Sequence, residues 1–299
     1  MEKGPSMRIA IDGVGYYVHL EGAGPAVLLL HGFAGSAETW RPLLADWRHQ
    51  FAVMAVDLLG HGRSDCPPDL ARYRMESVCD DLARLLDTLG VDRIHLVGYS
   101  MGGRIALSFA LLHPCRVNRL VLESASPGLA DPTQRALRRE SDEAWAGLIE
   151  EAGMTAFVDR WQQQPLFASQ SRLDPGTLQR VRQMRLAQPA QGLAATLRQL
   201  GSGRQPSWWH RLAELSAPSL FISGELDQKF TRLAVEMAVR MRTTTQAIVV
   251  PGVGHTVHLE APERFSSLVA GFLLPGGASG GDNRPAMGDP PSVGQPRKE

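Results

Sequence analysis

The chain has 299 residues, 43% of them hydrophobic, and its 31 basic residues balance its 31 acidic residues. This length and apolar content suffice for one large core with an insertion, and a formal net charge of zero gives no electrostatic signature for nucleic acid or an anionic membrane. No apolar run reaches the length of a transmembrane helix, and the first residues lack the apolar core of a signal peptide.

The three cysteines, Cys66, Cys79 and Cys115, are widely spaced and form no C-x-x-C pair. This pattern favours neither a disulfide framework nor a zinc site. We therefore expect a cytoplasmic protein without bound metal that neither binds nucleic acid nor inserts into a membrane.

Short apolar runs typical of strands alternate with helix-like segments along the chain. They lie at residues 8–11, 16–20, 26–30, 51–56, 94–97, 119–122, 220–223 and 247–250. Such alternation predicts an α/β fold with a mostly parallel, eight-stranded sheet covered by helices on both faces. The first two runs predict an antiparallel edge, and ligands are expected at the carboxyl ends of the strands.

The run at 26–30 leads into His31-Gly32-Phe33. A backbone N–H that follows such a turn can complete an oxyanion hole, and Phe33 is the candidate donor. His31 precedes the candidate nucleophile described next, so we expect it to shape this loop through hydrogen bonds rather than to act as a base.

The run at 94–97 enters a G-x-S-x-G pattern, with Gly98 and Gly102 flanking Ser100. This is the sequence form of a nucleophile elbow, a strand-to-helix turn so tight that the flanking positions must lack side chains. Ser100 is the candidate nucleophile or base. The N–H of Met101, at the positive end of the following helix, is the second candidate oxyanion donor.

Arg104 follows Ser100 by four positions, so the two side chains share a helix face with Cβ atoms about 5–6 Å apart. A guanidinium at this position suits a substrate carboxylate. The alternative is an internal salt bridge to an acid such as Asp57.

From about residue 127 to 209 strand signals cease, and helical stretches appear at 134–151 and 175–186. An insertion between two core strands predicts a lid over the site. Its arginines offer further carboxylate contacts, although each alone is more typical of a solvent-facing helix position; they include Arg135, Arg138, Arg139, Arg180, Arg182 and Arg185. We expect a core at residues 1–126 and 211–274, a lid at 127–210 and a disordered, glycine- and proline-rich tail at 275–299.

The last two strand runs are each followed by a short turn, and these turns end at Asp227 and His255. Together with Ser100 they complete a catalytic triad in the chain order serine, acid, histidine. Alternatives remain: Asp227 could be a helix N-cap, Glu225 is a rival acid, and His258, expected beside the site or at the surface, is a rival base. The triad itself allows two reactions, attack by Ser100 on a carbonyl carbon or removal of a proton next to a carbonyl.

The chain from about residue 31 to 274 resembles the 2-succinyl-6-hydroxy-2,4-cyclohexadiene-1-carboxylate synthases of menaquinone or phylloquinone biosynthesis, which are members of the α/β-hydrolase superfamily. The elbow and the segments at 31–33 and 57–62 are common to many hydrolases, whereas the Gly103-Arg104 ending and Ser126-Pro127-Gly128-Leu129 are more specific. Further matching segments lie at 35–36, 157–161, 165–167, 201–206 and 224–230. The tail and the residues before position 26 carry no diagnostic motif.

The resemblance implies a lyase that uses neither metal nor organic cofactor and acts on a small tricarboxylate as a monomer. It implies proton abstraction from 2-succinyl-5-enolpyruvyl-6-hydroxy-3-cyclohexene-1-carboxylate and loss of pyruvate. By motif position it assigns substrate contacts to Tyr99, Arg104, Arg138, Trp161, Arg185 and Lys229. The alternatives are a serine hydrolase of an ester, a lactone or a carbon–carbon bond beside a ketone, and a non-catalytic receptor on the same scaffold.

Overall fold

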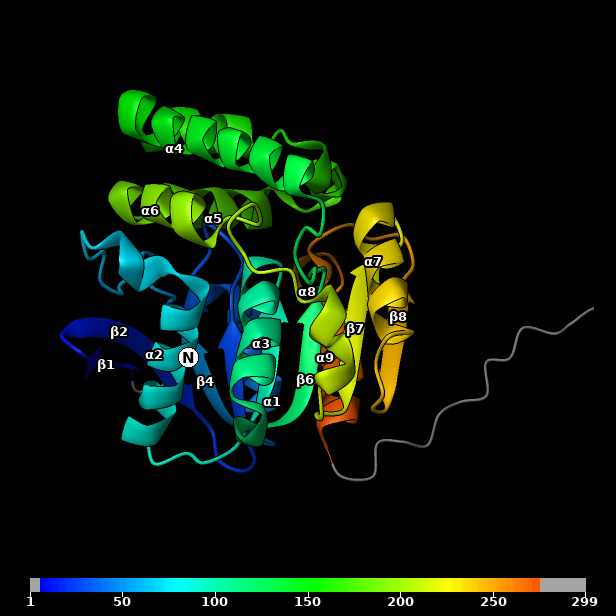
Figure 1. The fold of residues 1–299 in the computed structure, drawn as a ribbon. Helices are drawn as coiled ribbons and strands as arrows, with labels where there is room; N and C mark the ends of the chain where they lie inside the picture. The colour runs from blue at the N-terminus through cyan, green and yellow to red at the C-terminus, as the bar shows by residue number, and fades with distance from the viewer. Residues whose placement is uncertain (1–5, 275–299) are drawn as a thin grey trace, which may run out of the picture.

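The computed structural model describes residues 6–274, which form a central sheet with helices on both faces and further helices above one end (Figure 1). The predicted tail at 275–299 lies outside the described residues. The strands are β1 (Ser6–Ile11), β2 (Val14–Glu21), β3 (Ala26–Leu30), β4 (Ala52–Val56), β5 (Ile94–Tyr99), β6 (Val117–Glu123), β7 (Ser219–Gly224) and β8 (Thr245–Val250).

The sheet has eight strands in the order β1-β2-β4-β3-β5-β6-β7-β8. Strand β2 pairs antiparallel with β1 and β4, and every other pairing is parallel. The predicted eight-stranded sheet and its antiparallel edge are therefore confirmed. The carboxyl ends of β3, β5, β6, β7 and β8 meet at one edge, which brings the predicted site residues together.

Alternate residues of each strand face opposite sides of the sheet, as the two-residue repeat of a strand requires. Leu28 and Leu30 of β3 join one apolar cluster, whereas Val27 and Leu29 join the other. The first cluster is covered by α2 (Met75–Thr88), α3 (Met101–Leu112) and α7 (Gln228–Ala238), and the second by α1 (Arg41–Trp47) and α9 (Pro262–Leu273).

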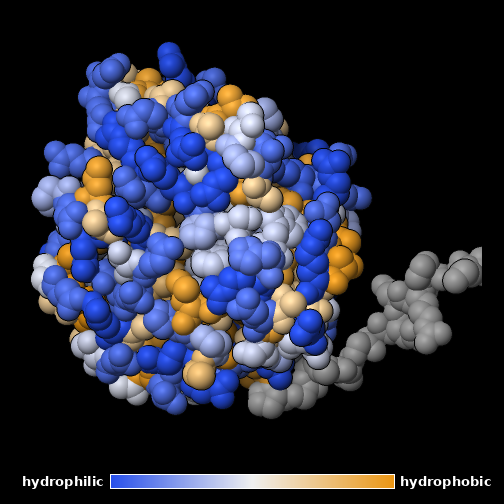
Figure 2. Space-filling model, in the orientation of Figure 1, coloured by the Kyte–Doolittle hydropathy of each residue, from blue (hydrophilic) through white to orange (hydrophobic). Residues whose placement is uncertain are grey.

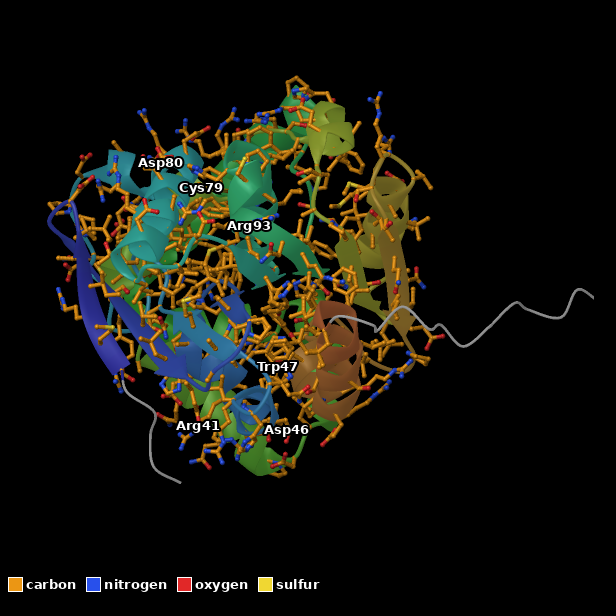
Figure 3. All side chains as sticks on the ribbon, turned by 90° about the horizontal axis from the view of Figure 1, so that it is seen from below. Arg41, Asp46, Trp47, Cys79, Asp80 and Arg93 are labelled. Atoms are coloured by element: carbon orange, nitrogen blue, oxygen red, sulfur yellow. The ribbon has the colours of Figure 1, made fainter. Side chains whose placement is uncertain are left out.

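Figure 3 views the molecule from below and shows Trp47 of α1 next to α9. The indole N–H of Trp47 donates to the Ser266 hydroxyl at 2.8 Å, and the ring is fully buried. This contact joins two helices more than two hundred residues apart in the chain. Helices α1 and α9 thus cover the second apolar cluster together.

A group of helices between β6 and β7 covers the carboxyl ends of the strands (Figure 1). We call this group the cap. It consists of α4 (Pro132–Trp161), η4 (Pro165–Arg172), α5 (Pro175–Leu186) and α6 (Ala190–Leu200). The predicted helical stretches fall within α4 and on α5, whereas η4 and α6 were not singled out by the sequence pattern.

Helix α4 is interrupted at Gly153, whose φ of 77° is a left-handed conformation that glycine adopts without steric cost. Beyond this break, Phe157 and Trp161 pack with Leu193 of α6 in an apolar cluster of the cap itself. The same cluster contacts Phe33, so the cap is packed against the loop after β3.

Short helices complete the described chain: η1 (Ala37–Trp40), η2 (Leu70–Tyr73), η3 (Pro114–Arg116), η5 (Trp209–Glu214) and α8 (Val257–Glu260). Within residues 6–274, no helix combines the length and apolar character needed to cross a membrane. Figure 2 shows that hydrophilic residues dominate the face seen in Figure 1, with hydrophobic residues in small scattered groups.

Candidate active site

Ser100 lies at the turn between β5 and α3, with φ of 51° and ψ of −107°. A non-glycine residue at positive φ is strained, and such strain concentrates at functional sites. The Ser100 N–H donates to the backbone oxygen of Glu123 at the end of β6, at 2.8 Å, which fixes the turn against the neighbouring strand.

The positions flanking Ser100 have no room for side chains. A Cβ at Gly98 would lie 2.4 Å from the Gly102 oxygen, and a Cβ at Gly102 would lie 2.1 Å from the Leu30 oxygen. Backbone atoms occupy both spaces and cannot rotate away, so the elbow requires glycine at both positions.

The structure brings Ser100, His255 and Asp227 together in one chain of hydrogen bonds. His255 Nδ1 lies 2.6 Å from Asp227 Oδ2, and His255 Nε2 lies 3.0 Å from Ser100 Oγ. A carboxylate only accepts, so Nδ1 carries the proton and Nε2 presents its lone pair to the serine hydroxyl. This is the arrangement that lets an imidazole take the proton of Ser100.

These contacts distinguish the two candidate acids by their partners. Asp227 is also the N-cap of α7, since its Oδ1 accepts from the Phe230 N–H at 3.4 Å, so one carboxylate makes both contacts. Glu225 is exposed, and its carboxylate accepts from the Gly252 N–H rather than from His255.

His258, the rival base, is buried behind the triad. Its Nδ1 lies 2.7 Å from Glu123 Oε2, and its backbone N–H donates to Glu123 Oε1 at 3.0 Å. Its ring packs against Tyr99 at a centroid distance of 4.7 Å. Of the two expected positions, beside the site or at the surface, His258 takes the first, since its side chain is buried against Tyr99 and Glu123.

The two candidate oxyanion donors lie where the loop after β3 approaches the elbow. A Cβ at Gly32 would lie 3.6 Å from Ser100 Cβ and 2.5 Å from the Tyr99 ring, so this loop packs directly on the nucleophile. Within residues 6–274, the N–H groups of Phe33 and Met101 have no hydrogen-bond acceptor. They are free to bind an oxygen that gains negative charge.

His31 holds this loop in place. Its Nε2 accepts from the Leu58 N–H at 3.0 Å, and its Nδ1 donates to the Gly32 oxygen at 2.7 Å. Burial lowers the pKa of His31 to about 4, so the ring is neutral at pH 7 with both nitrogens engaged. The contacts match the expected loop-shaping role and leave no nitrogen free to act as a base.

Arg104 lies on α3, and its Nη1 donates to the Leu200 oxygen at 2.7 Å and to Gln205 Oε1 at 2.9 Å. No carboxylate oxygen of the described residues lies within 4.0 Å of the guanidinium. Burial, with the nearby charge of Arg138, lowers the pKa of Arg104 to about 10. Asp57, the predicted alternative partner, instead accepts from two backbone N–H groups.

Arg185, near the end of α5, is only 8% exposed. Its guanidinium carbon lies 4.9 Å from the ring centroid of Phe167, and that ring lies 6.3 Å from the ring of His255. Neither a hydrogen-bond acceptor nor a carboxylate partner is found for it among the described residues. Burial lowers the pKa of Arg185, because a buried position disfavours the charged form.

The other residues assigned by resemblance lie in different environments. Arg138 is paired with Asp142, and Lys229 is exposed, with its ammonium 5.4 Å from the ring centroid of Phe230. Trp161 packs on Phe33 at 5.1 Å, and its buried indole N–H has no acceptor among residues 6–274.

Tyr99 is buried, and its hydroxyl lies 2.8 Å from Thr256 Oγ1. Its ring packs against Gly32 and His255, and its hydroxyl is already engaged with Thr256. The remaining cap arginines bind elsewhere: Arg135 and Arg139 donate to backbone oxygens, Arg180 donates to Thr177, and Arg182 pairs with Asp159.

Sequence reasoning missed Gln170, which donates from the cap to Thr256. It also missed Phe230, whose ring centroid lies 4.7 Å from that of His255. Gln170 lies just after the matched segment 165–167, and Phe230 ends the matched segment 224–230; these positions are the only sequence signal for them.

A parallel sheet with a serine elbow after β5, and an acid and a histidine after β7 and β8, is the arrangement of the α/β-hydrolase fold. The family model described as alpha/beta hydrolase fold matches residues 25–262. The fold and the site thus define an α/β-hydrolase-fold protein.

A Bacillus subtilis (strain 168) protein, provisionally named 2-succinyl-6-hydroxy-2,4-cyclohexadiene-1-carboxylate synthase, is 42% identical over 264 residues, 88% of this chain and 96% of that protein. The synthase of that name from Serratia proteamaculans (strain 568) is 31% identical, over 84% of this chain and 93% of its own length. The solved structure of MenH from S. aureus superimposes with a TM-score of 0.82 at 33% identity, over 86% of this chain and 97% of that one. The chain belongs to the 2-succinyl-6-hydroxy-2,4-cyclohexadiene-1-carboxylate synthase family and is a lyase of menaquinone biosynthesis.

Proposed function

We propose that the protein eliminates pyruvate from 2-succinyl-5-enolpyruvyl-6-hydroxy-3-cyclohexene-1-carboxylate and releases 2-succinyl-6-hydroxy-2,4-cyclohexadiene-1-carboxylate. The names of its relatives support this product, and the contacts of Ser100, His255 and Asp227 support the chemistry.

In this mechanism His255 takes the proton of Ser100, and the serine oxygen removes the ring proton next to the succinyl carbonyl. The electron pair of that C–H bond moves to the carbonyl oxygen, where the N–H groups of Phe33 and Met101 stabilise the enolate. Collapse of the enolate breaks the carbon–oxygen bond to the enolpyruvyl group. The proton held by His255 neutralises the departing group, which becomes pyruvate.

The observation that carries the proposal is the charge of Arg185, which has no carboxylate partner among the described residues. Arg185 is 8% exposed as a residue, has no anionic partner among the described residues, and lies with its guanidinium against the ring next to His255. Burying a cation without a counter-ion is costly, so the position favours an anionic ligand. A substrate with three carboxylates supplies such a ligand, and we propose Arg104, together with Arg138 beyond its pairing with Asp142, for the other carboxylates.

The predicted lid at 127–210 fits the same reaction. Arg138 and Arg185 lie on the cap, whereas Arg104 and the triad lie on the core. We therefore propose that the cap encloses the substrate between its own arginines and the elbow, which excludes water from the developing enolate.

The test supplies the enolpyruvyl substrate, made enzymatically from isochorismate and 2-oxoglutarate, and follows pyruvate by a coupled NADH assay. The wild-type protein should release pyruvate, and Ser100→Ala should nearly abolish the release. Efficient cleavage of activated esters through an acylated Ser100, without pyruvate release from this substrate, would instead establish the serine hydrolase alternative.

A further inference from the structure

We propose that Gln170 of the cap and Thr256 of the core are positioning residues that couple the placement of the cap to the catalytic imidazole of His255. The inference rests on the proposed function, since it assigns His255 as the base. It concerns how that base is held and not which substrate it serves.

Two hydrogen bonds connect the cap to the catalytic centre. Gln170 Nε2 donates to Thr256 Oγ1 at 2.9 Å, and the same oxygen lies 2.8 Å from the hydroxyl of Tyr99. Thr256 directly follows His255, and Tyr99 directly precedes Ser100. The chain of contacts therefore runs from η4 to the sequence neighbours of both reacting residues.

These contacts are removed from water. Gln170 and Thr256 are each 5% exposed, and Tyr99 is 8% exposed. A buried amide or hydroxyl that loses its partner bears the full cost of desolvation, about 1–3 kcal/mol. The contact is consequently stronger than a similar one at the surface, and a displaced cap would lose it.

Other contacts show that η4 packs along the segment that carries His255. Arg172 donates to the Gly252 oxygen at 3.3 Å, and a Cβ at Gly254 would lie 2.1 Å from the Ser169 hydroxyl. Phe167 contributes the ring next to His255. One face of η4 is thus matched to residues 252–256, and Gln170 supplies its hydrogen bond to the residue after the base.

The core contributes its own anchor to this segment. Glu260 accepts from the N–H groups of Gly254 and Thr256, at 2.8 and 3.3 Å, and so holds the backbone on both sides of His255. The Thr256 hydroxyl is the point at which the cap adds to this anchor. Loss of the cap contact should leave the fold intact and loosen the imidazole, which lowers the rate of proton transfer more than the affinity for substrate.

The experiment compares three single variants, Thr256→Val, Thr256→Ser and Gln170→Leu, and the double variant that combines Thr256→Val with Gln170→Leu. Valine keeps the shape of threonine without its hydroxyl, serine keeps the hydroxyl, and leucine removes the amide donor. The kcat and KM for pyruvate release are measured for each, with a thermal melt to establish folding.

We expect Thr256→Val and Gln170→Leu each to lower kcat about tenfold with KM within about twofold, consistent with loss of one positioning contact in proton transfer. Thr256→Ser should stay within about twofold of wild type. The double variant should be no slower than Thr256→Val, because both changes remove the same contact.

An unchanged kcat in Gln170→Leu, multiplied losses in the double variant, or a change in KM alone would overturn the inference. If Thr256→Val melts below the assay temperature, the kcat of Gln170→Leu is compared with that of Thr256→Ser, and this comparison tests the inference. If the wild-type protein releases no pyruvate, the proposed function fails, and the same variants are compared on p-nitrophenyl acetate, whose hydrolysis needs the same imidazole. Absence of any Ser100-dependent turnover would overturn both.

Discussion

Arg138 and Asp142 lie one helical turn apart on α4 and form an ion pair, with Nε donating to Oδ1 at 2.8 Å. Asp142 is 2% exposed, and its other oxygen has no partner among the described residues. Burial raises the pKa of Asp142, although the charge of Arg138 opposes that shift. Arg138 thus forms an ion pair before any substrate binds, whereas among residues 6–274 Arg104 feels the charge of Asp142 only without direct contact and Arg185 has no carboxylate within 4.0 Å.

This difference predicts unequal effects of removing the three charges. Arg104→Met and Arg185→Met should each raise KM about a hundredfold, since a charge-assisted hydrogen bond contributes about 1.5–3 kcal/mol. Arg138→Met should raise KM about tenfold at most, because its side chain is 40% exposed and already paired. Steady-state kinetics of pyruvate release measures all three. Arg180→Met, an exposed position on α5, is the matched control and should have no effect; equal losses at all four positions would contradict the assignment.

The two candidate acids can be separated by amide substitution. Asp227→Asn should lower kcat by about 10³ or more, because an amide that donates to Nδ1 favours the wrong tautomer of His255. Glu225→Gln should stay near the wild-type rate, since its carboxylate accepts only from the Gly252 N–H. The measurement is kcat for pyruvate release, with Ser100→Ala as the inactive reference. A larger loss of kcat in Glu225→Gln than in Asp227→Asn would identify Glu225 as the acid of the triad instead.

The elbow glycine Gly102 should not tolerate even a methyl group. In Gly102→Ala the new Cβ meets the oxygens of Leu30 and His31, at 2.1 and 2.5 Å, so α3 must move away from β3. We expect a loss of about 2–4 kcal/mol in the free energy of unfolding, together with loss of activity. Gly271→Ala in α9, where nothing lies within 4 Å, should instead stabilise the protein by about 0.5–1 kcal/mol. Urea unfolding compares the two, and a neutral Gly102→Ala would refute the close approach.

Stability should fall as the pH falls below about 6.5. Burial lowers the pKa of His31 to about 4 and that of His61 to about 3, against an ordinary value of 6.5. Between the pKa of the folded protein and that of the unfolded chain, the unfolded chain binds protons that the folded protein excludes. The contribution of these two histidines to the free energy of unfolding is therefore complete above pH 6.5 and is lost toward pH 3–4. Among residues 6–274, the His61 side chain makes one hydrogen bond, from Nδ1 to the Leu59 oxygen. Its replacement by leucine should therefore flatten the dependence of the urea midpoint on pH, and an unaltered slope would contradict this origin.

The sequence is sufficient for the sheet and for the order of the triad because both have local signatures. Apolar runs mark the strands, as in Ala26–Leu30, and paired glycines mark the elbow around Ser100. Parallel strands then bring Asp227 and His255 to one edge without further information.

Contacts between distant segments leave no such signature. Gln170 and Thr256 are 86 residues apart, and Glu123 and His258 are 135 apart. The first pair forms because the cap lies against the segment after β8. The second pair forms because β6 ends next to α8. Whether a cap arginine faces the site or a neighbouring carboxylate, as with Arg138 and Asp142, likewise depends on how α4 is turned about its axis.

The placement of Arg104 on α3 and of Arg185 on α5 has a mechanical consequence. A dianion long enough to reach both guanidinium groups would act as a removable cross-link between the core, which carries α3, and the cap, which carries α5. Amide hydrogens of α5 should then exchange with deuterium more slowly when such a guest is bound, while those of α1, on the far side of the sheet, should keep their rate.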